Sequence, residues 1–155
     1  MIEFLGNKEL LNYPKTAFLC SREVSSAAVL RSYDWATEMR IEKRVIVSGF
    51  QSKIEKDVLH FLLKGHQPII IVIARQMYKQ LPDEWQSPMN NGLLLVISVA
   101  PKAIRTSAKT AYDRNCYIAS IAESLVFGFI SKGSFLQLLY DCNRQKSIIL
   151  MKEKR

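Results

Sequence analysis

The sequence has few of the residues on which metal and disulfide sites depend. Its 155 residues include three cysteines and two histidines. The cysteines, Cys20, Cys116 and Cys142, are too widely spaced for a zinc site or a Cys-x-x-Cys pair. We therefore expect no metal and no cofactor. We interpret Cys20 and Cys142 as small core side chains in a protein of a reducing cytoplasm.

The chain also lacks the short motifs that bring catalytic groups together. It contains no Gly-x-Gly-x-x-Gly, no Walker loop, no His-Glu-x-x-His and no Gly-x-Ser-x-Gly. His60 and His66 have no partner motif, so we interpret them as a core-edge residue and a loop residue rather than as ligands. These absences argue against an enzyme.

Long apolar runs are absent as well, since none approaches the roughly 18–20 residues that cross a bilayer. Asn7, Lys8 and Glu9 interrupt the start of the chain, where a signal peptide would have its apolar core. The apolar and charged fractions, 48% and 23%, are ordinary for a globular protein. We expect a soluble, cytoplasmic protein with no membrane partner, folded as a single domain over residues 1–155.

Acidic residues are outnumbered by basic ones. The chain has 14 Asp and Glu against 22 Lys and Arg, which gives a formal net charge of +8 at pH 7. Such a balance favours an anionic partner, either a nucleic acid, a nucleotide or an acidic surface. Charge by itself does not choose among them.

Strand-like and helix-like segments alternate along the chain. The most strand-like segment, residues 68–73, is apolar at every position, as expected for a central parallel strand covered by helices on both faces. Short apolar runs predict further strands at about residues 16–20, 44–47, 93–99, 125–130 and 147–151. Apolar residues at helical spacing predict helices at about residues 25–41, 54–64, 81–92, 112–124 and 134–143.

This alternation predicts an α/β fold with a doubly wound, mainly parallel sheet and helices on both faces. The core of the fold would span residues 16–151. We expect the ends, residues 1–13 and 152–155, to be appendages.

Polar, basic and glycine residues gather where the predicted strands end. In a sheet of this kind ligands bind outside the carboxyl ends of the strands, so these clusters would share one edge. Strand ends followed by helix starts also present N–H groups and positive helix ends to an anion. The arrangement predicts a phosphate site. The clusters are Ser21-Arg22, Ser48-Gly49-Phe50, the basic residues Lys102, Arg105, Lys109 and Arg114, and Ser131-Lys132-Gly133-Ser134.

The same clusters, in the same order, resemble motifs of the DNA-processing protein A (DprA, or Smf) family and of its SLOG superfamily. The family has Gly-Ser-Arg after its first strand, where this chain has Cys20-Ser-Arg22. It then has Ser-Gly-x-Ala-x-Gly-Ile-Asp, where this chain has Ser48-Gly-Phe-Gln-Ser-Lys-Ile-Glu55. Its later Arg-Asn-Arg and Ser-Gly-Ser compare with Arg114-Asn-Cys116 and Lys132-Gly-Ser134. The resemblance covers residues 16–151 and implies a Rossmann-like fold that binds nucleic acid or a nucleotide.

The chain departs from the family pattern within these motifs. Cys20 and Lys53 replace glycines, Glu55 replaces an aspartate, and Cys116 replaces the second arginine of Arg-Asn-Arg. The enzymatic branch of the superfamily, the nucleotide phosphoribohydrolases, has a Pro-Gly-Gly-x-Gly-Thr loop followed by glutamate. Residues 127–134 lack this pattern, so cleavage of a nucleotide is the weaker alternative.

Several candidate residues could have either a functional role, as a ligand contact, or a structural one. Arg22 would clamp a phosphate, because a guanidinium holds two oxygens at once, or would form a surface ion pair. Phe50 would stack on a base or pack under its loop. Glu55 would order its loop by accepting backbone N–H groups. The predicted ligand contacts are Ser21, Arg22, Ser48, Gly49, Phe50, Lys53, Arg114, Asn115, Gly133 and Ser134, and Lys102, Arg105 and Lys109 either extend them as a basic track or form a solvated loop.

Two functions stay open on these grounds. The first is a non-enzymatic protein that holds single-stranded DNA by its phosphates, with a recombination protein and a second copy of the chain as candidate partners. The second is a sensor that binds a free nucleotide or a nucleotide-derived ligand in the same pocket. A long basic track favours the strand, and a narrow pocket favours the free nucleotide.

Overall fold

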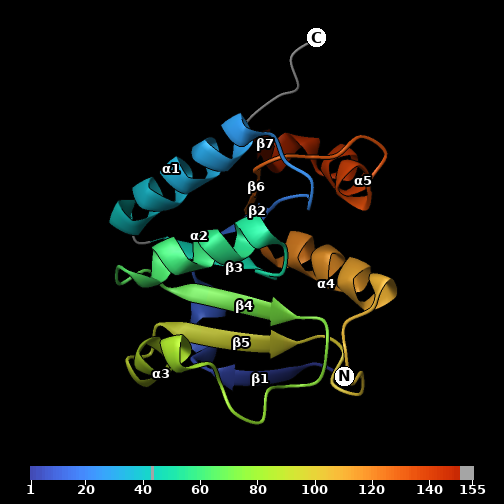
Figure 1. The fold of residues 1–155 in the computed structure, drawn as a ribbon. Coiled ribbons are helices and arrows are strands. Elements are labelled where there is room, and N and C mark those ends of the chain that lie inside the picture. The colour runs from blue at the N-terminus through green and yellow to red at the C-terminus, as the bar shows by residue number, and fades with distance from the viewer. Residues whose placement is uncertain (43, 151–155) are drawn as a thin grey trace.

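The computed structural model describes residues 1–42 and 44–150, whose strands form one seven-stranded sheet (Figure 1). The strand order across the sheet is β1-β5-β4-β3-β2-β6-β7. β1 runs antiparallel to β5, and the other described pairs are parallel, so the predicted mainly parallel sheet is confirmed. The strands are β1 (Glu3–Gly6), β2 (Lys15–Leu19), β3 (Val45–Ser48), β4 (Ile69–Ile73), β5 (Leu94–Ser98), β6 (Ser124–Phe127) and β7 (Ser147–Ile149).

Helices cover both faces of the sheet. Successive residues of a strand point to opposite faces, so a strand whose residues are all buried is covered on both faces. All five residues of β4 are buried. Ile69, Ile71 and Ile73 pack in one core cluster with residues of α1, α2 and α3, and Ile70 and Val72 pack in the other with residues of α4 and α5. The prediction of an interior strand at residues 68–73 is therefore confirmed. The helices are α1 (Ser26–Glu42), α2 (Lys53–Leu63), α3 (Asp83–Asn90), α4 (Ala108–Ile121) and α5 (Phe135–Cys142), with shorter turns η1 (Lys8–Asn12) and η2 (Arg144–Lys146).

The chain reverses its direction across the sheet at β2. From β2 it proceeds through β3, β4 and β5 on one side, and it then crosses over to β6 and β7 on the other. The helix after β2, α1, packs on one face, whereas the helix after β6, α5, packs on the other. Such a reversal opens a crevice at the carboxyl ends of the strands, because the loops there diverge.

The N-terminal segment is part of the fold, so the prediction of an appendage at residues 1–13 was wrong. β1 pairs with β5 along its length, and Leu10 in η1 is buried in the core. The Asn7 backbone N–H donates to the Leu94 carbonyl oxygen at 3.0 Å, and its side-chain amide donates to the Gly92 carbonyl oxygen at 2.8 Å. The residues of β1 are exposed and are held by backbone hydrogen bonds. Such a strand has no buried apolar face, so the sequence shows no apolar pattern for it. The predicted appendage at residues 152–155 lies outside the described residues.

α4 begins earlier than the predicted helix at residues 112–124. Ser107 and Thr110 form a capping box, in which the Ser107 hydroxyl accepts from the Thr110 N–H at 3.1 Å and the Thr110 hydroxyl accepts from the Ser107 N–H at 2.9 Å. Lys109 consequently lies in the first turn of the helix, and Arg114 in the second turn rather than at the helix start.

Cys142 is exposed, which corrects its interpretation as a core residue.

Candidate functional site

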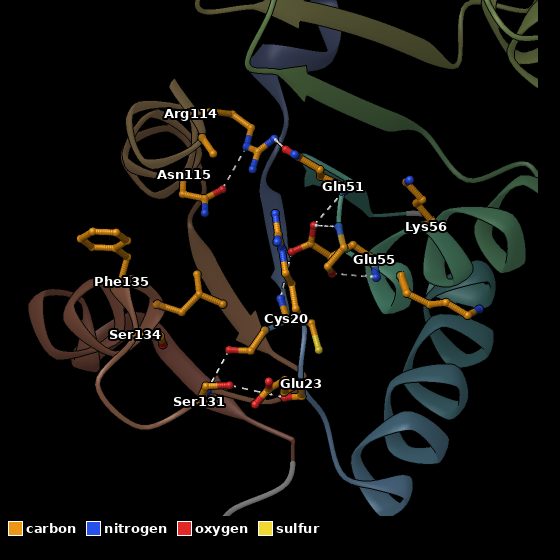
Figure 2. A pocket seen from close by; sticks show the side chains of 16 residues that line it. Cys20, Glu23, Gln51, Glu55, Lys56, Arg114, Asn115, Ser131, Ser134 and Phe135 are labelled. Carbon is orange, nitrogen blue, oxygen red and sulfur yellow. Dashed lines mark hydrogen bonds between the residues drawn. The ribbon is translucent and has the colours of Figure 1, made fainter. Parts of the chain in front are cut away.

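A pocket of about 860 Å³ lies where the chain reverses across the sheet, and we call it the strand-end pocket (Figure 2). Residues from four parts of the chain line it: the loop after β2, the segment that leads into the start of α2, the first two turns of α4, and the segment from the loop after β6 to the start of α5. This is the edge that the sequence predicted for ligands. The lining residues are Cys20, Ser21, Arg22, Glu23, Gln51, Ser52, Lys53, Glu55, Lys56, Ala111, Arg114, Asn115, Ser131, Ser134, Phe135 and Leu136.

Glu55 ties the wall of the pocket together. One carboxylate oxygen accepts from the Cys20 N–H at 3.0 Å, and the other accepts from the Gln51 and Ser52 N–H groups at 2.9 and 3.2 Å. The predicted role of Glu55 in ordering its loop is confirmed. Burial, and then the charge of Glu55, raise the pKa of the Cys20 thiol to about 12, so this thiol is protonated and not nucleophilic at neutral pH.

Arg114 is the most buried of the cationic residues that line the pocket. Its side chain is 5% exposed, and its guanidinium donates to the side-chain oxygens of Gln51 at 2.6 Å and Asn115 at 3.1 Å. Within residues 1–42 and 44–150, no carboxylate lies within the 4 Å of an ion pair with it. Burial lowers the pKa of Arg114, and the charge of Glu55 opposes this shift. A buried cation with neutral partners at a pocket wall favours the entry of an anion.

Gly49 makes room for this guanidinium. A Cβ atom at position 49 would lie 2.6 Å from the Arg114 Cζ, 2.7 Å from its Nε and 2.8 Å from its Nη1. The glycine after β3 is therefore explained by the close approach of Arg114 to the backbone. Gly49 was predicted as a ligand contact, but it does not line the strand-end pocket, and the group closest to it is a side chain of the protein itself.

Ser48 and Phe50 do not line the strand-end pocket. The Ser48 hydroxyl is fully buried and accepts from the Phe50 N–H at 3.1 Å, which closes a tight turn. Phe50 has a φ of 48° and its ring, 5% exposed, packs in the core cluster. Of the two roles open for Phe50, packing under its loop is the one seen, and base stacking is contradicted because the turn that follows β3 directs its ring inward.

Ser21 and Arg22 lie together at the loop after β2. The Ser21 hydroxyl accepts from the Ser131 N–H at 2.8 Å, which joins this loop to the loop after β6. Arg22 is exposed, and no residue within the described part of the chain forms a hydrogen bond or ion pair with its side chain. The surface ion pair that was its structural alternative is thus not seen there.

The remaining predicted contacts divide into lining and distant residues. Lys53, Asn115 and Ser134 line the pocket, although Lys53 is mainly exposed and forms an ion pair with Asp57 at 3.0 Å. The Ser134 hydroxyl has no hydrogen-bond partner in the described structure and does not cap α5. Gly133, with a φ of 76°, shapes the turn before it and does not line the pocket.

Lys102, Arg105 and Lys109 lie outside the pocket. Lys102 and Arg105 are exposed in residues 99–107, between β5 and α4, and we call this segment the basic loop. The Gln76 N–H donates to the Ala103 carbonyl oxygen at 2.7 Å, which holds the basic loop against the loop after β4. Lys109 belongs to α4 instead, where its Nζ donates to the Asp113 carboxylate at 2.8 Å.

Sequence reasoning missed Gln51, Lys56 and Phe135, which also line the pocket. Gln51 and Lys56 flank residues that the motifs had singled out, so position alone could have indicated them. Phe135 directly follows the Gly133-Ser134 pair, so its position next to a motif was the signal that could have indicated it. It is 61% exposed.

Neither a metal centre nor a membrane span is found in the described part of the chain. No group of three or more His, Cys, Asp or Glu side chains in residues 1–42 and 44–150 is arranged to hold a metal ion. No helix within the same residues is long and apolar enough to cross a membrane.

Comparison with known proteins identifies related chains and folds. The model of the DNA recombination-mediator protein A family matches residues 1–152. No match to a curated protein was found. The structure of DNA processing protein A from Helicobacter pylori, described for its single-stranded DNA binding mode, is similar with a TM-score of 0.78 and 18% identity, over 98% of this chain and 72% of that one.

Two further solved structures share the fold. DNA processing protein A from Streptococcus pneumoniae is similar with a TM-score of 0.75 and 19% identity, over 96% of this chain, which spans 53% of that protein. A molybdenum cofactor binding protein from Rippkaea orientalis is similar with a TM-score of 0.61 and 11% identity, over 88% of this chain and 76% of that one.

Proposed function

Because this chain belongs to the DNA recombination-mediator protein A family, we propose that it binds single-stranded DNA by its phosphates in the strand-end pocket, without catalysing a reaction on it. The observation that carries the proposal is the buried Arg114, whose guanidinium has only neutral hydrogen-bond partners at the wall of an open pocket. A phosphate oxygen would supply the missing negative charge.

Other features of the pocket support an anionic ligand. The exposed guanidinium of Arg22 lies at the same pocket and is available for a second phosphate contact. Ser134 and Asn115 add neutral polar groups, and Glu55 is occupied by three backbone N–H groups, so its charge is already partly compensated. The net charge of +8 would draw a polyanion toward the protein at long range.

The proposal includes no catalytic reaction because of the groups that line the pocket. Cys20 is held in its neutral form, and the Glu55 carboxylate faces backbone N–H groups rather than free space in the pocket. A general base needs a free carboxylate or imidazole within hydrogen-bonding reach of its substrate. Glu23 lines the pocket with an exposed carboxylate, but no imidazole or activated thiol among the lining residues is present to act with it as an acid or a nucleophile. Neither histidine lines the pocket.

The test is a titration of labelled oligo-dT and of single nucleotides against the protein, followed by fluorescence anisotropy at several salt concentrations. With three to five phosphate contacts, log affinity for the oligonucleotide should fall with log salt at a slope of about −2 to −3.5. A salt-independent affinity for oligonucleotide would contradict phosphate binding. Binding of single nucleotides with no gain for longer strands would favour a nucleotide sensor instead.

The Arg22→Ala variant tests the pocket itself. It should weaken oligonucleotide binding by about 1.5–3 kcal/mol, the usual size of a charge-assisted hydrogen bond. Arg44→Ala is a matched control, because Arg44 is also exposed but precedes β3, at the opposite edge of the sheet. Equal losses in the two variants would show that only net charge matters and that the pocket is not the site.

A further inference from the structure

Phe135 is an exposed aromatic side chain in a pocket built for an anion. It is the first residue of α5, it lines the strand-end pocket, and 61% of its surface is exposed to solvent. Figure 2 shows its ring at the outer side of the pocket, among the residues that α4 and α5 contribute. Single exposed apolar side chains are ordinary on a protein surface, so it is the position of this ring at the pocket, rather than its exposure alone, that points to a ligand.

The ring is supported by a second aromatic residue. Tyr112 of α4 packs its ring against that of Phe135 at 5.2 Å between centroids, with 62° between their planes. This edge-to-face contact is a favoured geometry for two aromatic rings. Because the two residues come from different helices, the Phe135 ring is held at the pocket before any ligand arrives, which reduces the cost of ordering it on binding.

A cationic group and an aromatic group lie at the same pocket. Arg114 of α4 and Phe135 of α5 both line the strand-end pocket, and Phe135 directly follows Ser134, whose hydroxyl has no partner within the described residues. A nucleotide combines an anionic phosphate with an uncharged aromatic base. A pocket lined by both a buried guanidinium and an exposed ring has groups for each part.

We propose that Phe135, supported by Tyr112, stacks on a nucleobase of the strand whose phosphates Arg114 and Arg22 hold. This inference rests on the proposed function and adds a contact to the bases. It places base stacking on a residue other than Phe50, whose ring is buried. Because every base has an aromatic face, stacking of this kind tolerates different sequences but requires that bases be present.

The experiment compares oligo-dT with an abasic oligonucleotide of the same length, which keeps the phosphates and lacks the bases. The parent protein should bind oligo-dT about fivefold or more tighter than the abasic strand. Phe135→Ala should lose that difference, binding both strands with nearly the affinity that the parent has for the abasic one. Phe135→Trp should keep the preference, and its fluorescence should be quenched on binding oligo-dT only.

Phe4→Ala is the matched control, since Phe4 is an exposed phenylalanine on β1, outside the strand-end pocket, and its removal should change neither affinity. A parent that binds both strands equally, or a Phe135→Ala variant that weakens both by the same factor, would overturn the stacking contact while phosphate binding stands. A parent that binds neither strand would overturn the proposed function and, with it, the stacking contact. Circular dichroism checks that each variant is folded.

Discussion

The strand-end pocket and the basic loop both lie at the carboxyl edge of the sheet, and both carry arginine and lysine, yet they hold these charges differently. In the pocket, Arg114 is 5% exposed and is fixed by Gln51, Asn115 and the space above Gly49. In the basic loop, Lys102 and Arg105 are exposed. One region has positioned its cation before binding, and the other offers solvated charges at the surface.

This difference separates two contributions to binding a polyanion. A positioned, partly dehydrated guanidinium adds directed hydrogen bonds to the counterion release that every phosphate contact brings. Exposed side chains act through the release of counterions and lose their effect as salt rises. We therefore expect the pocket to define where a phosphate sits and the basic loop to add mainly to the salt dependence of the affinity.

Replacement of Arg114 should have the largest effect and should affect binding and stability in opposite ways. Arg114→Met should weaken oligo-dT binding by about 10- to 100-fold, the range for loss of a charge-assisted hydrogen bond to an otherwise unpaired phosphate. Since a buried charge is replaced by an apolar side chain of similar volume, the free energy of unfolding should stay the same or rise. Anisotropy and urea denaturation measure the two. A variant that binds normally would remove Arg114 from the site.

Gly49→Ala should disturb the same guanidinium without removing it. The new Cβ would lie within 2.8 Å of three Arg114 atoms, and the flexible end of that side chain can move aside more easily than the backbone. We expect about a tenfold loss of affinity, in the range of one charge-assisted hydrogen bond. In the Arg114→Met background Gly49→Ala should cost nothing further in binding. Additive losses would show that position 49 acts independently of Arg114.

The sequence predicted the fold better than it predicted the site. Apolar runs such as residues 69–73 indicate where strands lie, whereas the order of the strands across the sheet, with its reversal at β2, was not predicted. The same pattern located the correct edge of the sheet. It did not reveal β1, because that strand buries no apolar face and is held by backbone hydrogen bonds.

Within the site, sequence position failed where side-chain direction decided the role. Phe50 follows the Ser-Gly of its motif as a solvent-facing residue would, but a φ of 48° turns it into the core. Phe135 was not singled out in the sequence, and it is exposed at the pocket. Glu55 was placed correctly from its position in the family-like motif, and the structure adds that it forms a capping box with Ser52.

The basic loop should contribute less than Arg114, and only at low salt. Lys102→Ala combined with Arg105→Ala should reduce the slope of log affinity against log salt by up to about 1.4, which is about 0.7 for each phosphate that is no longer neutralised. With this change in slope, the affinity of the double variant for oligo-dT should be several fold lower than that of the parent at about 50 mM salt and almost equal to it at high salt. Binding of a single nucleotide should be unchanged, because it would occupy the pocket alone. An unchanged slope with long oligo-dT would exclude the basic loop from the path of the strand.

Lys109 should have the smallest effect, although it is as exposed as the residues of the basic loop. Its ammonium group already donates to Asp113 within α4, and this hydrogen bond raises the pKa of Lys109 and keeps its charge paired. Lys109→Ala should therefore change oligonucleotide affinity by less than about twofold, since the strand would gain only what the exposed ion pair gives up. Asp113→Ala releases Lys109 and should strengthen binding by a similar factor, an increase that disappears when both residues are alanine. If Lys109→Ala instead weakened binding as much as removal of both basic-loop cations, the strand would run along α4, and pairing within the protein would not decide which surface cations bind DNA.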